Sequence, residues 1–129
     1  MTIVLPIPNR SVSPNGSLSR SKAGIYAKAA RIKRHRVRAM LKTKEALGQH
    51  FHKQGKPVPP FIGYSIAHYF PTAQYRDDDN ADAACKAYRD GIADALGIDD
   101  RQLPKLKLST RGKDAAHPRV EITLHITAP

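Results

Sequence analysis

The amino-acid sequence predicts a single α+β domain, in which a mixed sheet packs with two helices in the element order βαβαββ. The chain has 129 residues, a length that fits one domain with its own core. Two long stretches, 21–47 and 80–96, repeat their apolar residues at the spacing of an amphipathic helix. Four shorter stretches have the β-branched and aromatic content of strands. No segment is repeated, so one unit is expected to span residues 1–129.

In the N-terminal half, the first strand is expected at residues 3–8. Its two prolines cannot donate to a ladder, which restricts this strand to a sheet edge. Residues 11–22 are rich in Ser, Pro, Asn and Gly, and we expect a flexible loop there. The first helix follows over 21–47, with Gly48 as its C-terminal cap. Its predicted apolar stripe consists of Ile25, Ala29, Ile32, Met40 and Leu47.

In the C-terminal half, residues 61–70 are predicted to form a strand that leads into an acidic loop. Asp79 or Asn80 is a candidate N-cap for the second helix, which is expected to end near Leu96 with Gly97 just beyond it. Residues 103–110 and 120–127 then alternate as two strands, and residues 111–118 are expected to join them as a hairpin. The predicted apolar stripe of the second helix consists of Ala81, Ala84, Cys85, Tyr88, Ile92 and Leu96.

Charge narrows the class of partner. The chain carries 22 Lys and Arg against 11 Asp and Glu, a net charge of +11, which favours a polyanion and above all nucleic acid. An anionic membrane surface is the weaker alternative. No apolar run approaches the roughly 18 residues of a membrane span, and the N-terminus lacks the pattern of a signal peptide. The single Cys85 favours a reducing cytoplasm and lies on an apolar stripe, where a small buried hydrophobe is expected rather than a nucleophile.

Cations cover the first helix outside its apolar stripe, and no acidic residue precedes Glu45 on it. Such a helix is expected to contact phosphates, with little preference for base sequence. Cations beside the loop at 11–22 are expected to close on DNA, and Tyr75 is a candidate for stacking on an unpaired base. The predicted nucleic-acid contacts are Arg10, Arg20, Lys22, Lys28, Arg31, Lys33, Arg34, Arg36, Arg38 and Arg76.

Three adjacent aspartates, Asp77 to Asp79, interrupt this basic chain. One interpretation is a solvated turn whose last residue caps the second helix and complements its dipole. The other is a magnesium site: carboxylates two residues apart in an extended segment, at 77 and 79, point to the same face and can share one ion, whereas Asp78 points away. A calcium loop of the EF-hand type is excluded because Ala81 and Asp82 occupy positions that need an oxygen ligand and a glycine.

Two further residues extend the magnesium hypothesis. Lys86 lies about two helical turns after Asp79, so its ammonium is a candidate for stabilising the scissile phosphate. The alternative for Lys86 is an ordinary ion pair with Asp82 or Asp90, each four residues away. An unbroken second helix would be about 25 Å long, and four further residues cannot return that distance. Asp100 is therefore expected to complete the site of a partner subunit in a two-fold homodimer.

With these residues in view, the sequence resembles the RusA-type Holliday junction resolvases of bacteria and their phages. The matching segments are LPIPNRSVSPNG near the start, RDDDN at 76–80, KAYRDGIADALGIDD at 86–100 and the closing VEITLHI. They span nearly the whole chain in the family's order. The combination of R-D-x-D-N, a downstream lysine and a D-D pair is more specific than the proline-rich start.

The resemblance implies a homodimeric, Mg²⁺-dependent endonuclease that cuts four-way DNA junctions by paired symmetric incisions, with Mn²⁺ as a possible substitute and no small-molecule cofactor. By residue, Asp77 and Asp79 match the acids of R-D-x-D-N, and Asp100 matches the second acid of the D-D pair. Lys86 corresponds to the family's catalytic lysine, at a spacing three residues longer. The implied location is the bacterial cytoplasm, with a phage gene as one possible source.

Two other functions remain open from the sequence. A non-catalytic basic DNA- or RNA-binding protein would use the acidic cluster only as a helix cap. A less selective nuclease for branched or flap DNA would keep the metal site and lack the preference for four-way junctions.

Overall fold

The structure, a computed structural model, describes residues 1–8, 12, 22–73 and 78–129, without the side chains of 78–80. It confirms a single α+β domain with a mixed four-stranded sheet. The strands are β1 (Thr2–Leu5), β2 (Gly63–Phe70), β3 (Thr110–Lys113) and β4 (Arg119–His125), in the order β1-β4-β2-β3. β4 is antiparallel to both β1 and β2, while β3 runs parallel to β2.

A row of buried isoleucines crosses three of the four strands on one face of the sheet. Ile122 on β4 lies opposite Ile3 on β1 and opposite Ile66 on β2. Each of the three is at most 2% exposed. The burial of β4 alternates along its length, with Val120 and Leu124 on the same inward face as Ile122. This alternation, read from the sequence, correctly predicts that β4 covers the core with one face.

The predicted hairpin between residues 103–110 and 120–127 is wrong. Residues 103–109 contribute only an isolated bridge, from Lys105 to Tyr64, and β3 begins at Thr110. Tyr64 on β2 holds this segment through two backbone hydrogen bonds, one donated to Pro104 and one accepted from Leu106. The connection between β3 and β4, residues 114–118, therefore crosses from one side of β2 to the other. Alternation fixes the face that a strand presents, but not its neighbours in the sheet.

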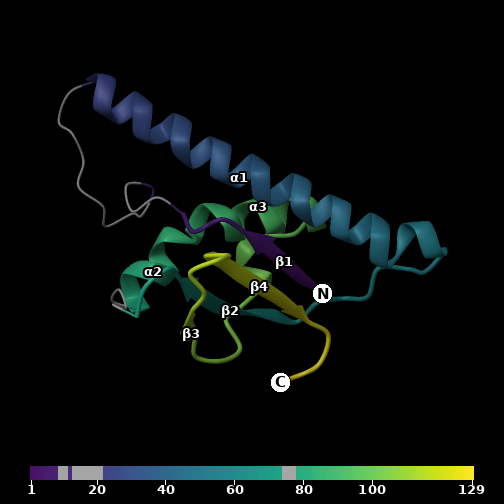
Figure 1. The fold of residues 1–129 in the computed structure, drawn as a ribbon. Coiled ribbons are helices and arrows are strands. Elements are labelled where there is room, and N and C mark those ends of the chain that lie inside the picture. Colours follow the sequence, from purple (N-terminus) through teal and green to yellow (C-terminus); the bar gives the residue numbers. More distant parts are fainter. Residues whose placement is uncertain (9–11, 13–21, 74–77) are drawn as a thin grey trace.

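The helix α1 (Lys22–His50) is three residues longer at its C-terminus than predicted, so Gly48 lies inside it and caps nothing. A short 3-10 helix, η2 (His52–Gln54), follows and ends at Gly55, whose φ is 64°. Ala39, Thr43 and Leu47 form the buried stripe in the C-terminal half. The predicted stripe fails in the other half, where Ile25 is 50% exposed, because α1 extends past the sheet there (Figure 1).

The predicted single helix over 80–96 is two helices, α2 (Asp78–Ala84) and α3 (Lys86–Leu96). The backbone N–H of Cys85 donates to the carbonyl of Asp82 at 3.0 Å, three residues back, and this tighter turn ends α2. Because α2 begins at Asp78, residues 79 and 80 are helical positions and not the predicted cap. Gly97 ends α3 with a φ of 69°, as predicted.

Both α1 and α3 lie on the same side of the sheet, with α1 crossing α3 (Figure 1). Gly91 on α3 permits a close crossing, because a Cβ there would lie 2.1 Å from the backbone oxygen of Arg36. Tyr88 and Ile92 on α3, and Cys85 just before this helix, belong to the hydrophobic core and are at most 1% exposed. The buried positions thus confirm the apolar stripe predicted for the second helix. Burial also raises the pKa of the Cys85 thiol to about 12. Cys85 is a buried hydrophobe, as expected.

Candidate functional site

The first part of α1 carries a basic face of exposed cations. Lys22, Lys33, Arg34 and Arg38 are exposed, and Arg31 is half-buried. Lys28 is 8% exposed and does not share this face. The predicted contacts Arg10, Arg20 and Arg76, together with most of the loop at 11–22, lie outside the described residues.

Arg36 also lies on α1, but its guanidinium is engaged within the protein. Nε and one terminal nitrogen donate to the two carboxylate oxygens of Asp94 on α3, at 2.6 Å and 2.8 Å. The Asp94 hydrogen bonds raise the pKa of Arg36, and the same contact lowers the pKa of the Asp94 carboxyl. A bidentate pair of this kind fixes the plane of the guanidinium. Arg36 therefore joins α1 to α3 and is a poorer phosphate contact than the sequence predicts.

The acidic cluster is described only in part. Asp77 and Tyr75 lie outside the described residues, and the backbone of Asp79 belongs to the first turn of α2. The extended segment expected at residue 79 is therefore replaced by helix at that position. The argument that two carboxylates point to the same face needs an extended backbone, and this condition is not met at residue 79.

Lys86, the first residue of α3, is half-exposed and paired with Asp90. Its Nζ lies 3.1 Å from one carboxylate oxygen of Asp90, four residues along the same helix. This is the ordinary ion pair that the spacing offers as an alternative to a catalytic role. Pairs of this type on an exposed helix surface contribute only about 0.3 to 0.5 kcal/mol, so the ammonium can leave Asp90 at little cost.

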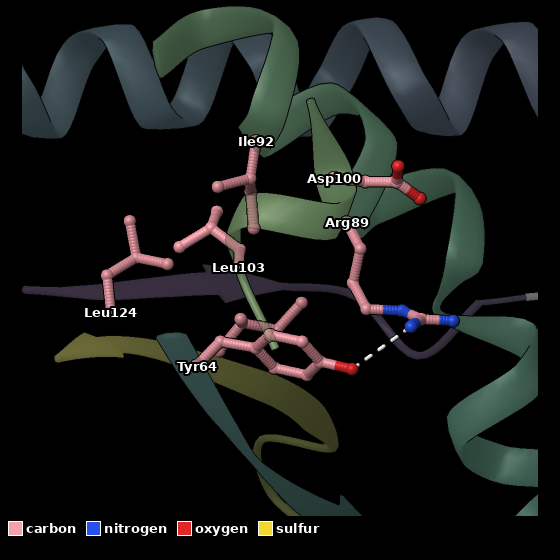
Figure 2. Close-up of a pocket in the computed structure, with 7 residues that line it drawn as sticks. Tyr64, Arg89, Ile92, Asp100, Leu103 and Leu124 are labelled. Carbon is pink, nitrogen blue, oxygen red and sulfur yellow. Dashed lines mark hydrogen bonds between the residues drawn. The ribbon is translucent and has the colours of Figure 1, made fainter. Parts of the chain in front are cut away.

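Asp100 begins a 3-10 helix, η3 (Asp100–Gln102), which Asp99 caps. The Asp99 side chain accepts a hydrogen bond from the backbone N–H of Arg101, and the Gln102 side chain accepts one from the backbone N–H of Asp99. Asp100 lines a small pocket of about 30 Å³, with room for about two water molecules. Its other lining residues are Tyr64, Arg89, Ile92, Leu103, Ile122 and Leu124. Figure 2 shows the Asp100 carboxylate and the Arg89 guanidinium on the same side of this pocket.

Arg89 is a pocket residue that the sequence reasoning did not single out. Its terminal nitrogen donates to the Tyr64 hydroxyl at 3.0 Å, and its guanidinium carbon lies 5.7 Å from the centre of the Tyr64 ring (Figure 2). Its Nε is buried and finds no hydrogen-bond partner among the residues that the structure describes. Arg89 follows Lys86 by three residues on α3, and its side chain lines the same pocket as Asp100. The geometric case for Asp100 acting in a partner subunit assumed an unbroken helix of about 25 Å, and the break at Cys85 removes it.

Asp82 forms the other feature that the sequence reasoning missed. It accepts hydrogen bonds from His68 on β2 at 2.7 Å, from Ser109 at 2.8 Å and from Lys105. Burial opposes the charged form of Asp82, but the bonds from His68, Lys105 and Ser109 prevail and hold its pKa well below the usual range. A signal was available, because Asp82 is a charge beside the buried positions 81, 84 and 85. The network anchors α2, which opens with the acidic cluster, to the sheet.

The described side chains include several carboxylates and imidazoles that could bind a metal ion singly. Within that part of the chain, no three His, Cys, Asp or Glu side chains gather into a metal-binding group. The carboxylate of Asp100 is exposed, and carboxylate oxygens are the donors that Mg²⁺ prefers. The donor chemistry of Asp77, Asp79 and Asp100 therefore fits magnesium. None of the described helices combines the length and the apolar character needed to cross a bilayer.

No family model matches the chain. A curated relative, an uncharacterized protein of Xylella fastidiosa (strain Temecula1 / ATCC 700964), is 38% identical over 104 residues. The match covers 78% of this chain and 61% of the relative. The chain thus spans less than two thirds of the length of this relative.

Proposed function

We propose that the protein is a Mg²⁺-dependent endonuclease that resolves four-way DNA junctions by paired symmetric incisions. Two copies would form a homodimer, since paired incisions need two equivalent sites. The proposed location is the bacterial cytoplasm. The proposal rests first on the order of motifs along the chain: R-D-x-D-N, then Lys86, then the D-D pair.

The structural observation that carries the proposal is the position of Asp100. Asp100 shares a pocket with Arg89, one helical turn after Lys86, and α2 ends directly before Lys86. Asp100, which follows α3 in the sequence, thus lines a pocket together with Arg89 and Ile92 of that helix. This supports a site assembled from one chain.

In this proposal Asp77, Asp79 and Asp100 hold the ion through carboxylate oxygens. Bound Mg²⁺ would supply a more acidic water and neutralise charge that develops on the phosphoryl oxygens. Lys86 would leave Asp90 and direct its ammonium to the scissile phosphate or to the leaving oxygen. The exposed cations of α1 would hold the phosphates of the DNA arms, which contributes affinity without base specificity.

The test is cleavage of a labelled synthetic four-way junction, with Mg²⁺, with Mn²⁺ and with chelator. We expect paired symmetric nicks that need the metal. Asp79→Asn and Asp100→Asn should each lower the cleavage rate by about a hundredfold or more, because even residues behind a metal's direct ligands typically account for about 10- to 100-fold. Junction binding should persist or tighten in both variants, since each removes a negative charge.

Asp99→Asn is the matched control, because asparagine also caps a helix and Asp99 is the neighbour of Asp100. It should cleave like the wild type. A plain duplex of equal length, added as competitor, separates a junction resolvase from a less selective nuclease. Tight binding without cutting under any divalent metal would contradict the nuclease proposal.

A second candidate function is nucleic-acid binding without chemistry. The observation that favours it is the ion pair of Lys86 with Asp90, which leaves the lysine with a structural role. In this case Lys86→Ala would leave every property but local helix stability unchanged. In the nuclease proposal, Lys86→Ala lowers cleavage while junction affinity changes little.

A further inference from the structure

Tyr26 is the most exposed tyrosine among the described residues. Its relative exposure is 71%, whereas that of Tyr64 is 6%. It lies in the N-terminal half of α1, which extends past the sheet in Figure 1. A large exposed aromatic costs free energy in water unless a partner covers it. Its neighbours on the helix surface, Ala29 and Ala30, are small and exposed, so the faces of the ring are accessible.

Two lysines lie in line with this ring. Lys22 precedes Tyr26 by four residues and Lys33 follows it by seven, and all three are exposed. At about 100° per residue, the three positions fall within roughly 40° of one line along the helix. The lysines are then about 6 Å and 10 Å from Tyr26 along the axis. An aromatic ring between two cations, in line, matches the alternation of bases and phosphates along a single strand.

Charge argues against a second copy of this helix as the partner. The face carries cations, and α1 has no acidic residue before Glu45, so two copies of this half would repel each other. An anionic bilayer is less well matched, because Ile25 and Tyr26 are separated around the helix by about 100° and do not form one broad apolar face.

We propose that Tyr26 stacks on an unpaired base of a nucleic acid, with Lys22 and Lys33 contacting the phosphates on either side of it. This rests on the proposed function only in taking nucleic acid as the partner. It adds a specificity: a strand with unstacked bases, such as an opened junction centre or a single-stranded arm, is preferred over a continuous duplex. Stacking serves every base, so no sequence preference is expected.

The experiment is fluorescence anisotropy with a labelled oligothymidine single strand, and with a duplex of equal length, against the full chain. Tyr26→Ala should weaken single-strand binding about thirtyfold, the middle of the range for one stacked base. Tyr26→Phe keeps the ring and should stay within about twofold of the wild type. Duplex binding should change by less than about twofold in either variant. Because Tyr26 is 71% exposed, both variants are expected to fold, and circular dichroism verifies this.

Two controls give the result its meaning. Leu41→Ala removes another exposed apolar side chain from α1 and should leave both affinities unchanged. Lys33→Ala should lower the slope of log affinity against log salt by about 0.7 for the single strand, whereas Tyr26→Ala leaves this slope unchanged. Vesicles of anionic lipid test the membrane alternative, and loss of vesicle binding in Tyr26→Ala without loss of single-strand binding would overturn the inference.

The outcomes separate this inference from the proposed nuclease. Equal losses on single strand and duplex, or no loss in Tyr26→Ala, would refute stacking while junction cleavage by the wild type stands. A ring-dependent preference for single strands in a protein that cuts no junction would uphold stacking and refute the nuclease. A wild type that binds no single strand would refute stacking, whereas a wild type that cuts no junction would refute the nuclease.

Discussion

Arg36 on α1 donates two hydrogen bonds to Asp94 on α3, at 2.6 Å and 2.8 Å. The two side chains are 48% and 36% exposed, so solvent screens the pair and its contribution to stability is expected to be modest. Its geometry matters more, because a bidentate contact fixes both distance and direction. The pair joins α1, the helix proposed to hold DNA, to α3, which begins at Lys86 and is followed by Asp100.

We predict that Arg36→Ala lowers the free energy of unfolding by less than about 1 kcal/mol. Urea unfolding measures this, and a double-mutant cycle with Asp94→Ala isolates the coupling, expected at about 0.5 kcal/mol. The salt dependence of DNA binding should be nearly unchanged in Arg36→Ala and clearly reduced in Lys33→Ala. A reduction as large in Arg36→Ala would show that Arg36 leaves Asp94 for phosphate.

Gly91 and Gly48 should respond in opposite directions to the same substitution. A Cβ at Gly91 would lie 2.1 Å from the Arg36 backbone oxygen, so Gly91→Ala must separate α1 from α3. We expect a loss of about 3 kcal/mol in unfolding free energy, at the upper end for overpacking. At Gly48, inside α1, nothing lies within 4 Å, and Gly48→Ala should stabilise by about 0.5 to 1 kcal/mol. Thermal and urea unfolding of both variants measure the contrast.

Loss of the Asp82 carboxylate should destabilise the protein in a pH-dependent way. Asp82→Asn weakens the contacts to His68, Lys105 and Ser109, and we expect a loss of about 2 kcal/mol at pH 7. The pKa of Asp82 is lower in the folded protein than its unfolded value of about 3.9, so its contribution is complete above about pH 5. That contribution is lost progressively as the pH falls below about 4. The stability difference between wild type and variant should therefore be smaller at pH 3 than at pH 7, and an equal difference at both would contradict the assignment.

Mixed dimers should reveal which chain supplies Asp100. If Asp79 and Asp100 act within one chain, a heterodimer of Asp79→Asn with Asp100→Asn has no complete site and should cut neither strand. If Asp100 acts across the dimer, one of the two sites keeps all its carboxylates, and single nicks should appear. The position of Asp100 beside Arg89 favours the first result. The measurement is a nicking assay on tagged, purified heterodimers, with the two homodimers as controls.

The sequence predicts the elements of this fold better than their pairing. Local sequence content correctly indicates β2 through its aromatic and β-branched residues, and β4 and the stripe from Ala81 to Ile92 through apolar periodicity, because each signal lies within one segment. It cannot show that β4 lies between β1 and β2, since that depends on partners distant in the chain. It also misses the break at Cys85, where no proline or glycine marks the end of α2.

The candidate site divides in the same manner. Asp100 and Lys86 are found by motif, because their spacing along the chain carries the signal. Arg89 on α3 is recognisable as a site residue only in the structure, where the Tyr64 hydroxyl on β2 accepts its hydrogen bond. The partners of Asp82 come from β2 and from the segment at 105–109, so no spacing unites them.

The central position of β4 has a consequence for how the protein folds during its translation. β1 leaves the ribosome before the other three strands, yet its partner in the sheet, β4 (Arg119–His125), lies more than a hundred residues later in the chain. During translation β1 and the inner edge of β2 must wait unpaired, and their late closure over a long stretch of chain makes folding slow. A ribosome that stops before β4 releases a chain in which β1 and one edge of β2 lack a partner, together with a strongly basic helix, and such a chain is prone to aggregate.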